Sequence, residues 1–592
     1  MNDSDTTPTW DLTDLYAGPD DPGLGADLDR AEALATELES AHQGRVADLD
    51  GAGLAALLTR YEDALAAMYR PQMYARLLQS TEGDDEAVRA SASRCSERGT
   101  AVANRLRFID TELGKASDAV AQAWATSPDL AGYAHHVSRA RAQAPHTLDG
   151  EVESALSTKD LTGRRAWTEL YDQRTTGWRF DVTVKGEKKV LTLPEVRGLR
   201  EDTDRDVRRA AWGALTEKLA ADGELLAYIT NTVYQDHRLE TDLRGYAAPE
   251  SPTMLDDELP LATLDALMSA VESHYPVAQE YLRMKGKALG LDRLASYDLL
   301  APWPAPERDC DWPTSRAMVL DAFGALAPDI ADRARAFFDE RRIDAAPRAG
   351  KRDGAFCSGM LPGIGPRVLT NHHGRLRDVF TLAHELGHGV HFALAGERQS
   401  PLNYWPTSPM AETASVFGEM VLARSLLDGE TDPTLRRALL AQRIEEALGT
   451  IHRQVAFTRW EREAHARRAK GTVPADELCA MWTREMDRLY GDAVERFEAD
   501  RWGWSAIPHL IHYRFYCYSY AFGQLLVFAL YALWERDAAA FVPKYRELLA
   551  GGGSDAPAAM LSRLGVDITD PEFWARGLDV VTRMVEDFGR AG

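Results

Sequence analysis

Apolar residues recur at three- and four-residue spacing through much of the chain, which is the pattern of amphipathic helices. The first such region covers residues 24–144 and includes LAALLTRYEDALAAMY at residues 54–69. The same spacing dominates again from residue 411 to residue 534. The pattern therefore predicts a mainly α-helical protein.

Three stretches interrupt the helical pattern. The segment WRFDVTVKGEKKVLTL, residues 178–193, alternates apolar and polar positions around a KGEK turn and predicts a β-hairpin. Residues 350–374 favour two strands joined by a turn rich in glycine and proline, just before the most chemically informative helix. The proline-rich residues 301–313 predict a loop, because proline cannot donate a backbone hydrogen bond.

Composition adds size and charge to this picture. A chain of 592 residues, 45% hydrophobic and 27% charged, can bury a large core, and its length suggests more than one lobe. The 92 acidic residues against 68 basic ones give a net charge of −24, which repels nucleic acid and anionic membranes, so we expect neither as a partner. The longest apolar run, residues 525–534, is too short for a span of roughly 20 residues and predicts a buried helix.

The five cysteines are far apart in the sequence, and none forms a C-x-x-C pair. This argues against a disulfide framework and against a thiolate zinc site. The segment MNDSDTTPTWDLTDLY is acidic and has neither the basic nor the apolar part of a secretory signal. We therefore expect a cytoplasmic protein.

The segment FTLAHELGHGVHFALAG, residues 380–396, has helical spacing and contains H-E-x-x-H at His384, Glu385 and His388. Residues four apart lie on one helix face, so both imidazoles can bind one ion at about 2.0–2.1 Å. Glu385 would lie beside the ion without binding it, which is the place of a general base for an activated water. A purely structural zinc site is disfavoured, because such sites commonly use four ligands including cysteine.

Two histidines need a third ligand. The metzincin pattern requires glycine and histidine where this chain has His391 and Leu394, so that class is excluded. Residues 409–420, PMAETASVFGEM, offer Glu412 and Glu419, seven positions apart on one face of a following helix. Glu412 is the preferred ligand and Glu419 the hydrogen-bond partner of a ligand histidine, although on spacing either could reach the ion.

The other histidines in this region are weaker candidates. His391 is one turn beyond His388 and too far along the helix axis to share the ion with both ligand histidines, so we expect it to pack or to support a ligand. His372 and His373 precede the helix and are expected to be exposed turn residues, with at most a role in substrate contact.

Residues 507–522, IPHLIHYRFYCYSYAF, contain two histidines and four tyrosines. Such a run is often aromatic core. A zinc peptidase, however, needs donors that point at the oxyanion formed from the scissile carbonyl, and tyrosine O–H or histidine N–H groups can supply them. The segment therefore gains interest from the H-E-x-x-H motif elsewhere in the chain.

Taken together, TLAHELGHGVH, PMAETASVFGE and PHLIHYRFYCYSYAFG resemble the oligoendopeptidase F branch of the thimet oligopeptidase family of zinc metallopeptidases. WDLTDLY near the start and LLAGGGS…GVDITDPEFW near the end extend the likeness over nearly the whole chain. The resemblance implies a mainly α, two-lobed peptidase with a deep substrate cleft and a small β element next to the H-E-x-x-H helix. It implies an N-terminal helical lobe at residues 1–190 and a zinc peptidase domain at residues 191–592.

Carried over by position, the resemblance implies that one zinc ion is held by the ligands His384, His388 and Glu412, with Glu385 as the base. It further implies that a histidine and two tyrosines bind substrate and stabilise the oxyanion; the matching residues are His509, Tyr513 and Tyr520, with His512 and Tyr518 as alternatives to the first and last. The edge GAFC at residues 354–357 matches a strand that pairs with substrate backbone.

The expected activity is hydrolysis of internal bonds in short, unstructured oligopeptides. An exopeptidase is an alternative, but it would need a group that binds a free terminus, and no motif for one can be singled out. A non-catalytic peptide-binding protein that keeps zinc for stability is a second alternative, disfavoured because such a site has no need for Glu385.

Overall fold

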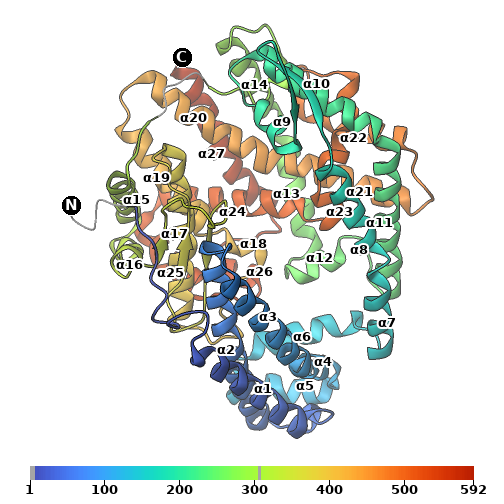
Figure 1. Ribbon diagram of the computed structural model, residues 1–592, viewed down its shortest axis with the longest axis vertical. Helices are drawn as coiled ribbons and strands as arrows, with labels where there is room; N and C mark the ends of the chain where they lie inside the picture. Colours follow the sequence, from blue (N-terminus) through green and yellow to red (C-terminus); the bar gives the residue numbers. More distant parts are fainter. Residues whose placement is uncertain (1–6, 304–307, 592) are drawn as a thin grey trace. The chain divides into compact units, whose positions relative to one another are not determined.

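The computed structural model describes residues 7–303 and 308–591. The chain forms two compact units, each assembled from separate stretches of sequence. Unit 1 contains residues 1–145, 307–429 and 530–567, and unit 2 contains residues 146–306, 430–529 and 568–592. The helices of both units are labelled in Figure 1. The expected division at residue 190 stays a prediction.

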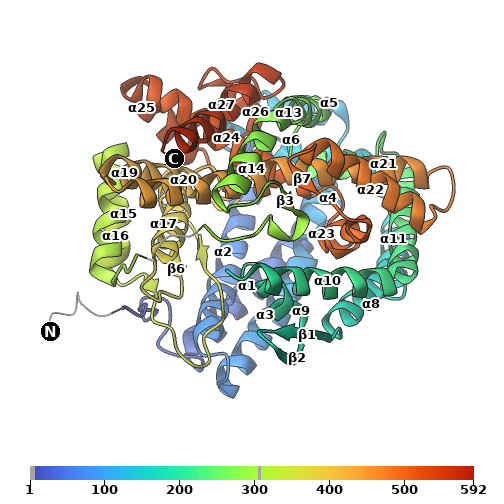
Figure 2. The same cartoon turned by 90° about the horizontal axis from the view of Figure 1, so that it is seen from above.

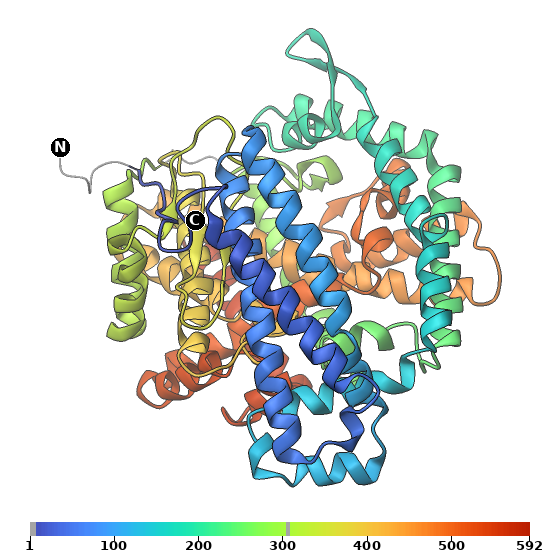
Figure 3. The ribbon, with the colours of Figure 1, turned by 60° about the horizontal axis from the view of Figure 1, so that its bottom comes forward.

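Unit 1 is built mainly from helices. Figure 3 shows its three long N-terminal helices side by side in blue. Asp21, Asp50 and Asp85 start them, because each carboxylate accepts a backbone N–H of the first turn. The helices of unit 1 are α1 (Pro22–His42), α2 (Gly51–Thr81), α3 (Glu86–Leu106), α4 (Phe108–Lys115), α5 (Asp118–Ala125), α6 (Ala134–Gln143), α15 (Trp312–Leu326), α16 (Pro328–Asp339), α17 (Leu376–Gly396), α18 (Ser408–Ala411), α19 (Ser415–Gly429), α25 (Ala538–Ala550) and α26 (Pro557–Ser562).

A small sheet of unit 1 lies against α17. Its strand order is β4-β6-β5, with β4 (Ile343–Asp344) parallel and β5 (Phe356–Ser358) antiparallel to β6 (Arg367–Leu369). The two strands expected within residues 350–374 are thus confirmed, while β4 was not foreseen. β5 and β6 both pack on α17, so the predicted β element beside the H-E-x-x-H helix is confirmed.

Unit 2 is also mainly helical. It contains the predicted hairpin, β1 (Phe180–Val184) paired antiparallel with β2 (Glu187–Leu191), and the short parallel pair β3 (Leu294–Ala295) and β7 (Val494–Glu495). Figure 2 shows the hairpin near α9 (Leu193–Leu199) and α10 (Arg205–Ala221). The helices of unit 2 are α7 (Gly150–Asp160), α8 (Arg164–Thr176), α9 (Leu193–Leu199), α10 (Arg205–Ala221), α11 (Gly223–Leu243), α12 (Ser251–Asp256), α13 (Leu261–Ser273), α14 (Tyr275–Ala288), α20 (Pro433–Ala447), α21 (Arg453–Arg468), α22 (Ala475–Tyr490), α23 (His509–His512) and α27 (Pro571–Arg590).

The remaining helix, α24 (Cys517–Arg536), contains the longest apolar run of the sequence. By length and composition it could cross a membrane, but 72% of its apolar window is buried inside the structure. Leu525, Leu526 and Val527 have no exposed surface. The prediction of a buried helix is confirmed.

The proline-rich stretch expected to be a loop includes residues 304–307, which lie outside the described residues. Residues 301–303 have no regular structure, and α15 begins at Trp312. The last two residues of the predicted loop therefore belong to a helix. Pro313 is tolerated there because a proline in the first helical turn removes no intrahelical hydrogen bond.

Candidate active site

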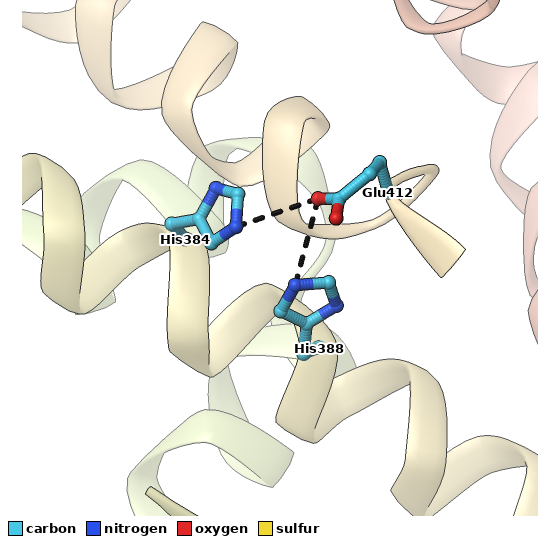
Figure 4. Close-up of side chains that lie close together, drawn as sticks. All are labelled: His384, His388 and Glu412. Carbon is cyan, nitrogen blue, oxygen red and sulfur yellow. Dashed lines mark ion pairs between the residues drawn. The ribbon is translucent and has the colours of Figure 1, made fainter. Parts of the chain in front are cut away.

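Helix α17 carries both histidines of the H-E-x-x-H motif. The carboxylate of Asp378 fixes its first turn by accepting the backbone N–H groups of His373, at 2.7 Å, and of Arg375, at 3.1 Å. His384 and His388 follow on one face, with ring centroids 4.8 Å apart. Figure 4 shows both rings directed toward the carboxylate of Glu412.

Glu412 lies in a turn rather than in a helix. α18 ends at Ala411 and α19 begins at Ser415, so the prediction that one continuous helix carries Glu412 and Glu419 is wrong. The turn is held from outside, because the Tyr545 hydroxyl donates to the carbonyl of Thr413 at 3.1 Å. This long-range contact has no signature in the sequence around the glutamates.

Two glycines let α17 approach the segment that follows Glu412. A Cβ on Gly387 would lie 2.4 Å from the carbonyl oxygen of Ala414 and 2.6 Å from the Cα of Ser415. A Cβ on Gly418 would lie 2.9 Å from the carbonyl oxygen of Ala383. The backbone of α17 therefore approaches the segment from Ala414 to Gly418 at two points, which brings Glu412 within reach of the imidazoles.

The three side chains form a donor triangle of the size that zinc requires. The Oε2 atom of Glu412 lies 3.4 Å from Nε2 of His384 and 3.5 Å from Nε2 of His388. One donor atom from each residue can be chosen so that all lie within 4.8 Å of one another. Tetrahedral zinc with bonds of about 2.0–2.1 Å separates its ligand atoms by about 3.3–3.4 Å. The residues present therefore fit this ion.

Polar neighbours orient two members of the triangle. The Nδ1 atom of His384 lies 2.7 Å from Oε1 of Glu419, the partner expected from the sequence. Burial lowers the pKa of His384, but the hydrogen bond and charge of Glu419 outweigh it and raise that pKa to about 9. The hydroxyl of Ser415 donates to Oε2 of Glu412 at 2.7 Å. Sequence reasoning missed Ser415, since a serine at the start of a helix is common.

Glu385 is buried, with 6% of its surface exposed. Burial raises the pKa of its carboxyl to about 7, while the charge of His384 and the backbone N–H of Cys357 act to lower it. Cys357 belongs to β5, which lies at the edge of its sheet. The sheet thus contacts the carboxyl directly, a relationship that the sequence did not reveal. A buried carboxyl with such a pKa can exchange a proton near neutral pH.

The other histidines near the triangle lie outside it. His391 is buried against Phe392, and burial lowers its pKa to about 3, which agrees with the expected packing role. His373 is exposed, as expected. His372 is not: only 6% of it is exposed and its Nε2 lies 2.9 Å from the Ser315 hydroxyl. The expectation of an exposed turn residue was wrong for His372.

In unit 2, His509 and Tyr520 form a pair. Nε2 of His509 lies 3.1 Å from the Tyr520 hydroxyl, and Tyr516 stacks on the His509 ring at 5.8 Å. Tyr520 is 38% exposed, and Tyr513 is 65% exposed, although large aromatic side chains are commonly buried. These side chains are therefore accessible to a ligand.

The alternatives to His509 and Tyr520 are engaged elsewhere in unit 2. Nε2 of His512 lies 2.9 Å from a carboxylate oxygen of Asp172. Tyr518 has no exposed surface, and its hydroxyl donates to Asp257. Tyr520 is therefore the accessible member of its alternative, whereas His509 and His512 are both partly exposed and differ in their partners, Tyr520 and Asp172.

A buried carboxyl that sequence reasoning missed holds the loop between α23 and α24. Phe515 has the left-handed backbone conformation, φ 56°, which is rare for a residue with a side chain. Its backbone N–H donates to Oε1 of Glu461 at 2.8 Å. Glu461 has no exposed surface, and burial raises its pKa to about 8. This contact fixes the bend at Phe515, which separates His509 and His512 of α23 from Tyr518 and Tyr520 of α24.

A helix that presents H-E-x-x-H beside a carboxylate in the position of a third ligand is typical of the class of metallopeptidases. The comparisons with known proteins give the family. Residues 198–302 and 326–580 match Peptidase family M3, and residues 112–180 match the family described as Oligopeptidase F. The chain therefore belongs to peptidase family M3, and the resemblance noted in the sequence is confirmed. It is an enzyme, a peptidase.

Relatives of known sequence match over almost the whole chain. The Oligoendopeptidase F homolog of Lactococcus lactis subsp. lactis (strain IL1403) is 26% identical, and the match covers 95% of this chain and 94% of that protein. Oligopeptidase PepF of Bacillus subtilis (strain 168) is 25% identical, over 95% of this chain and 84% of that protein.

Solved structures share the fold. A Chlamydophila abortus protein superposes with a TM-score of 0.90 at 21% identity, covering 99% of this chain and 98% of that one. Oligoendopeptidase-F from Enterococcus faecium superposes with a TM-score of 0.70 at 22% identity, covering 95% and 98%.

Proposed function

We propose that this peptidase is a zinc-dependent endopeptidase that hydrolyses internal bonds of short, unstructured oligopeptides. The observation that carries the proposal is the donor triangle of His384, His388 and Glu412 beside the buried carboxyl of Glu385. The names of its relatives, Oligoendopeptidase F and Oligopeptidase PepF, support oligopeptides as the substrate class.

One zinc ion per chain is the proposed cofactor. Two imidazole nitrogens and one carboxylate oxygen are a donor set of catalytic zinc sites, which leave a fourth position open. Glu419 holds the Nδ1 atom of the His384 ring, so Nε2 is the nitrogen that would bind a zinc ion. A bound zinc ion supplies Lewis acidity, which lowers the pKa of water toward 7 and polarises the scissile carbonyl.

Glu385 is the proposed general base. Its carboxyl accepts the proton of the attacking water and later returns it to the departing amine. The N–H of Cys357 holds this carboxyl, and burial keeps its pKa close to neutral, where one group can both take and give a proton.

His509, Tyr513 and Tyr520 are the proposed substrate-binding and oxyanion-stabilising residues. The accessible hydroxyls of Tyr513 and Tyr520 are available as donors for the charge that develops on the carbonyl oxygen. His509, hydrogen-bonded to Tyr520, orients that hydroxyl. The edge strand β5 is proposed to pair with the substrate backbone, which allows binding of many sequences.

We also propose a cytoplasmic location, with no nucleic-acid or membrane partner. All five cysteines are free thiols in the structure, which supports a reducing compartment. The net charge of −24 opposes contact with polyanions.

Mass spectrometry of products from a mixed peptide library tests the proposal. The library contains peptides blocked at both ends and their free forms, and it is incubated with enzyme as purified, with chelator, and with chelator followed by zinc. We expect internal cleavage of blocked peptides, its loss with chelator and its return with zinc. Removal of single terminal residues from free peptides alone would instead indicate an exopeptidase, and activity that survives complete zinc removal would contradict a zinc enzyme.

A further inference from the structure

Unit 2 contains a cavity of about 650 Å³, a size suited to a small ligand. Its wall is partly aromatic and apolar, with Trp212, Phe457 and Trp482 among the lining residues. His509, which is proposed above to bind substrate, lies at the same wall. The helices α9, α10, α21 and α22 supply about half of the lining and can be followed in Figure 2.

The charged groups of this cavity are mostly cationic, although the chain as a whole is strongly acidic. Four arginines line it: Arg197, Arg200, Arg453 and Arg496. Two acidic residues, Glu201 and Asp500, also do so. In a chain of 92 acidic and 68 basic residues, this local excess of arginine is not explained by composition.

Two of the arginines have no carboxylate partner within the described part of the chain. Arg496 pairs with Asp487, and Arg197 donates to the carbonyl of Ala506 at 3.2 Å. Arg200 and Arg453 make no ion pair with any described residue, and the buried Nε of Arg200 has no hydrogen-bond partner there. Burial lowers the pKa of Arg200, and the neighbouring charge of Arg453 lowers it further.

The carboxylate of Asp500 acts on Arg200 through its charge, which raises the pKa of Arg200, but it forms no ion pair with either arginine of the described chain. Asp500 accepts the Trp212 indole N–H at 2.8 Å with one oxygen and the Phe497 backbone N–H at 2.8 Å with the other. Its carboxylate thus belongs to the framework of the wall. An unpaired guanidinium that is partly buried, as in Arg200, is costly, and the exposed guanidinium of Arg453 adds a second positive charge beside it. An anionic ligand would therefore gain from both.

The backbone beside Arg453 is also unusual. Residues Leu448–His452 form a π-helical segment between α20 and α21, and Arg453 is the first residue after it. Such segments are rare and are found frequently at functional sites. The π-helical segment thus ends directly before Arg453, whose guanidinium group lacks a carboxylate partner in the described chain.

We propose that this cavity binds a carboxylate carried by an apolar or aromatic group, with Arg200 and Arg453 as the carboxylate ligands. Arginine suits this role because its planar group donates two parallel hydrogen bonds to a carboxylate. His509, the proposed substrate-binding residue, lies at the same wall, so we take the C-terminal residue of an oligopeptide substrate as the occupant. This choice rests on the proposed function. Carboxylate binding itself does not rest on it.

Isothermal titration calorimetry with the full-length chain tests the site. The probes are 3-phenylpropionate and its amide, and a pentapeptide ending in phenylalanine as free acid and as C-terminal amide. The peptides are titrated into the zinc-loaded Glu385→Gln variant to limit cleavage. The phenylpropionate pair is titrated into zinc-free protein, so that the acid cannot bind a metal ion. We expect each acid to bind at least tenfold more tightly than its amide.

Variants assign the preference to the two arginines. Arg200→Gln and Arg453→Gln should each bring the ratio of acid to amide affinity close to one. The matched control Arg209→Gln changes an exposed arginine of α10 that pairs with Asp206, and it should retain the ratio. Arg453 is exposed, so its variant is expected to fold even if the Arg200 variant does not.

Equal affinity for acid and amide in protein that retains both arginines would overturn the proposal. So would an acid-to-amide affinity ratio that stays the same in both arginine variants. A preference for phenylpropionate without a preference for the peptide acid would overturn the peptide as occupant. Binding heat does not depend on turnover. A chain that binds the acids but cleaves no peptide would therefore contradict the proposed function and not this site.

Discussion

The Nδ1 atom of His384 lies 2.7 Å from Oε1 of Glu419, while Nε2 of the same ring lies 3.4 Å from Oε2 of Glu412. One imidazole therefore joins two carboxylates of different roles. The carboxylate at Nδ1 fixes the ring orientation and raises the basicity of Nε2. The carboxylate near Nε2 is at the distance expected of a fellow zinc ligand.

The Glu419→Gln variant should bind zinc about 10- to 100-fold more weakly, because the neutral amide supports the His384 ring less well than a carboxylate. Competition with a chromophoric chelator measures the affinity. The control Glu397→Gln changes an exposed glutamate paired with Arg333 and should leave zinc affinity unchanged. Unaltered affinity of Glu419→Gln would show that this hydrogen bond does not support the metal.

The Glu385→Gln variant should retain one zinc ion per chain and lose about 10²- to 10⁴-fold in kcat, since an amide cannot accept the proton of water. Metal analysis and peptide turnover measure the two effects separately. Near-normal hydrolysis by this variant would contradict the assignment of the base.

The Gly387→Ala variant should bind zinc more weakly and be destabilised by about 1–3 kcal/mol, because the new methyl group meets the backbone of Ala414 and Ser415. The comparison is Gly213→Ala in α10, where nothing lies within 4 Å of the added group. That change should stabilise the protein by about 0.5–1 kcal/mol through helix propensity alone. Denaturant unfolding and zinc titration of both variants measure the difference.

Tyr520→Phe and Tyr518→Phe should have different consequences. Loss of the accessible Tyr520 hydroxyl should lower kcat by about 10²-fold or more with a smaller change in KM, because it removes an oxyanion donor. Loss of the buried Tyr518 hydroxyl should leave kcat nearly unchanged and destabilise the fold by about 1–3 kcal/mol, because Asp257 loses its donor. If only Tyr518→Phe lowered kcat, the assignment of the two tyrosines would be reversed.

The stability of the protein should fall between about pH 5 and pH 8 through Glu461. Burial raises the pKa of this carboxyl to about 8 in the folded chain, against about 4.3 when unfolded. Between these values the folded state binds more protons, so its stability decreases as the pH rises. Glu461→Gln removes the titrating group, and its melting temperature should fall less over this range.

The control for the Glu461 prediction is Glu463→Gln, which changes a glutamate paired with Arg484 at the surface. It should show the same pH dependence as the unaltered protein. Equal slopes for all three proteins would mean that Glu461 is ionised in the folded state already at pH 5.

The sequence predicted those parts of the site that depend on local spacing. One helical turn places His384 and His388 together, and that relationship needs no tertiary information. Glu412 and Glu419 could be named but not placed, because the turn between their helices is held by Tyr545, far along the chain. The contact of β5 with Glu385 likewise depends on the pairing of β5 with β6 and on the packing of both strands against α17, which the spacing of residues does not give.

The cavity of unit 2 that Arg200 and Arg453 line could not be predicted from the sequence for the same reason. Arg200 and Arg453 are separated by more than two hundred positions, and neither belongs to a recognisable motif. Their lack of carboxylate partners is a property of the packed unit, not of spacing. In contrast, the helices and the hairpin of unit 2 follow from periodicity that each segment contains.

The proposed zinc donors and Glu419 lie between positions 384 and 419, entirely within unit 1, whereas His509 and Tyr520 belong to unit 2. Substitutions can therefore abolish zinc binding and peptide turnover separately. A screen for inactive enzymes should divide into two classes, one that fails to acquire metal and one that acquires it fully yet does not turn over. Substitutions of the zinc donors should fall in the first class, and substitutions of His509 or Tyr520 in the second, where Glu385→Gln of unit 1 should join them.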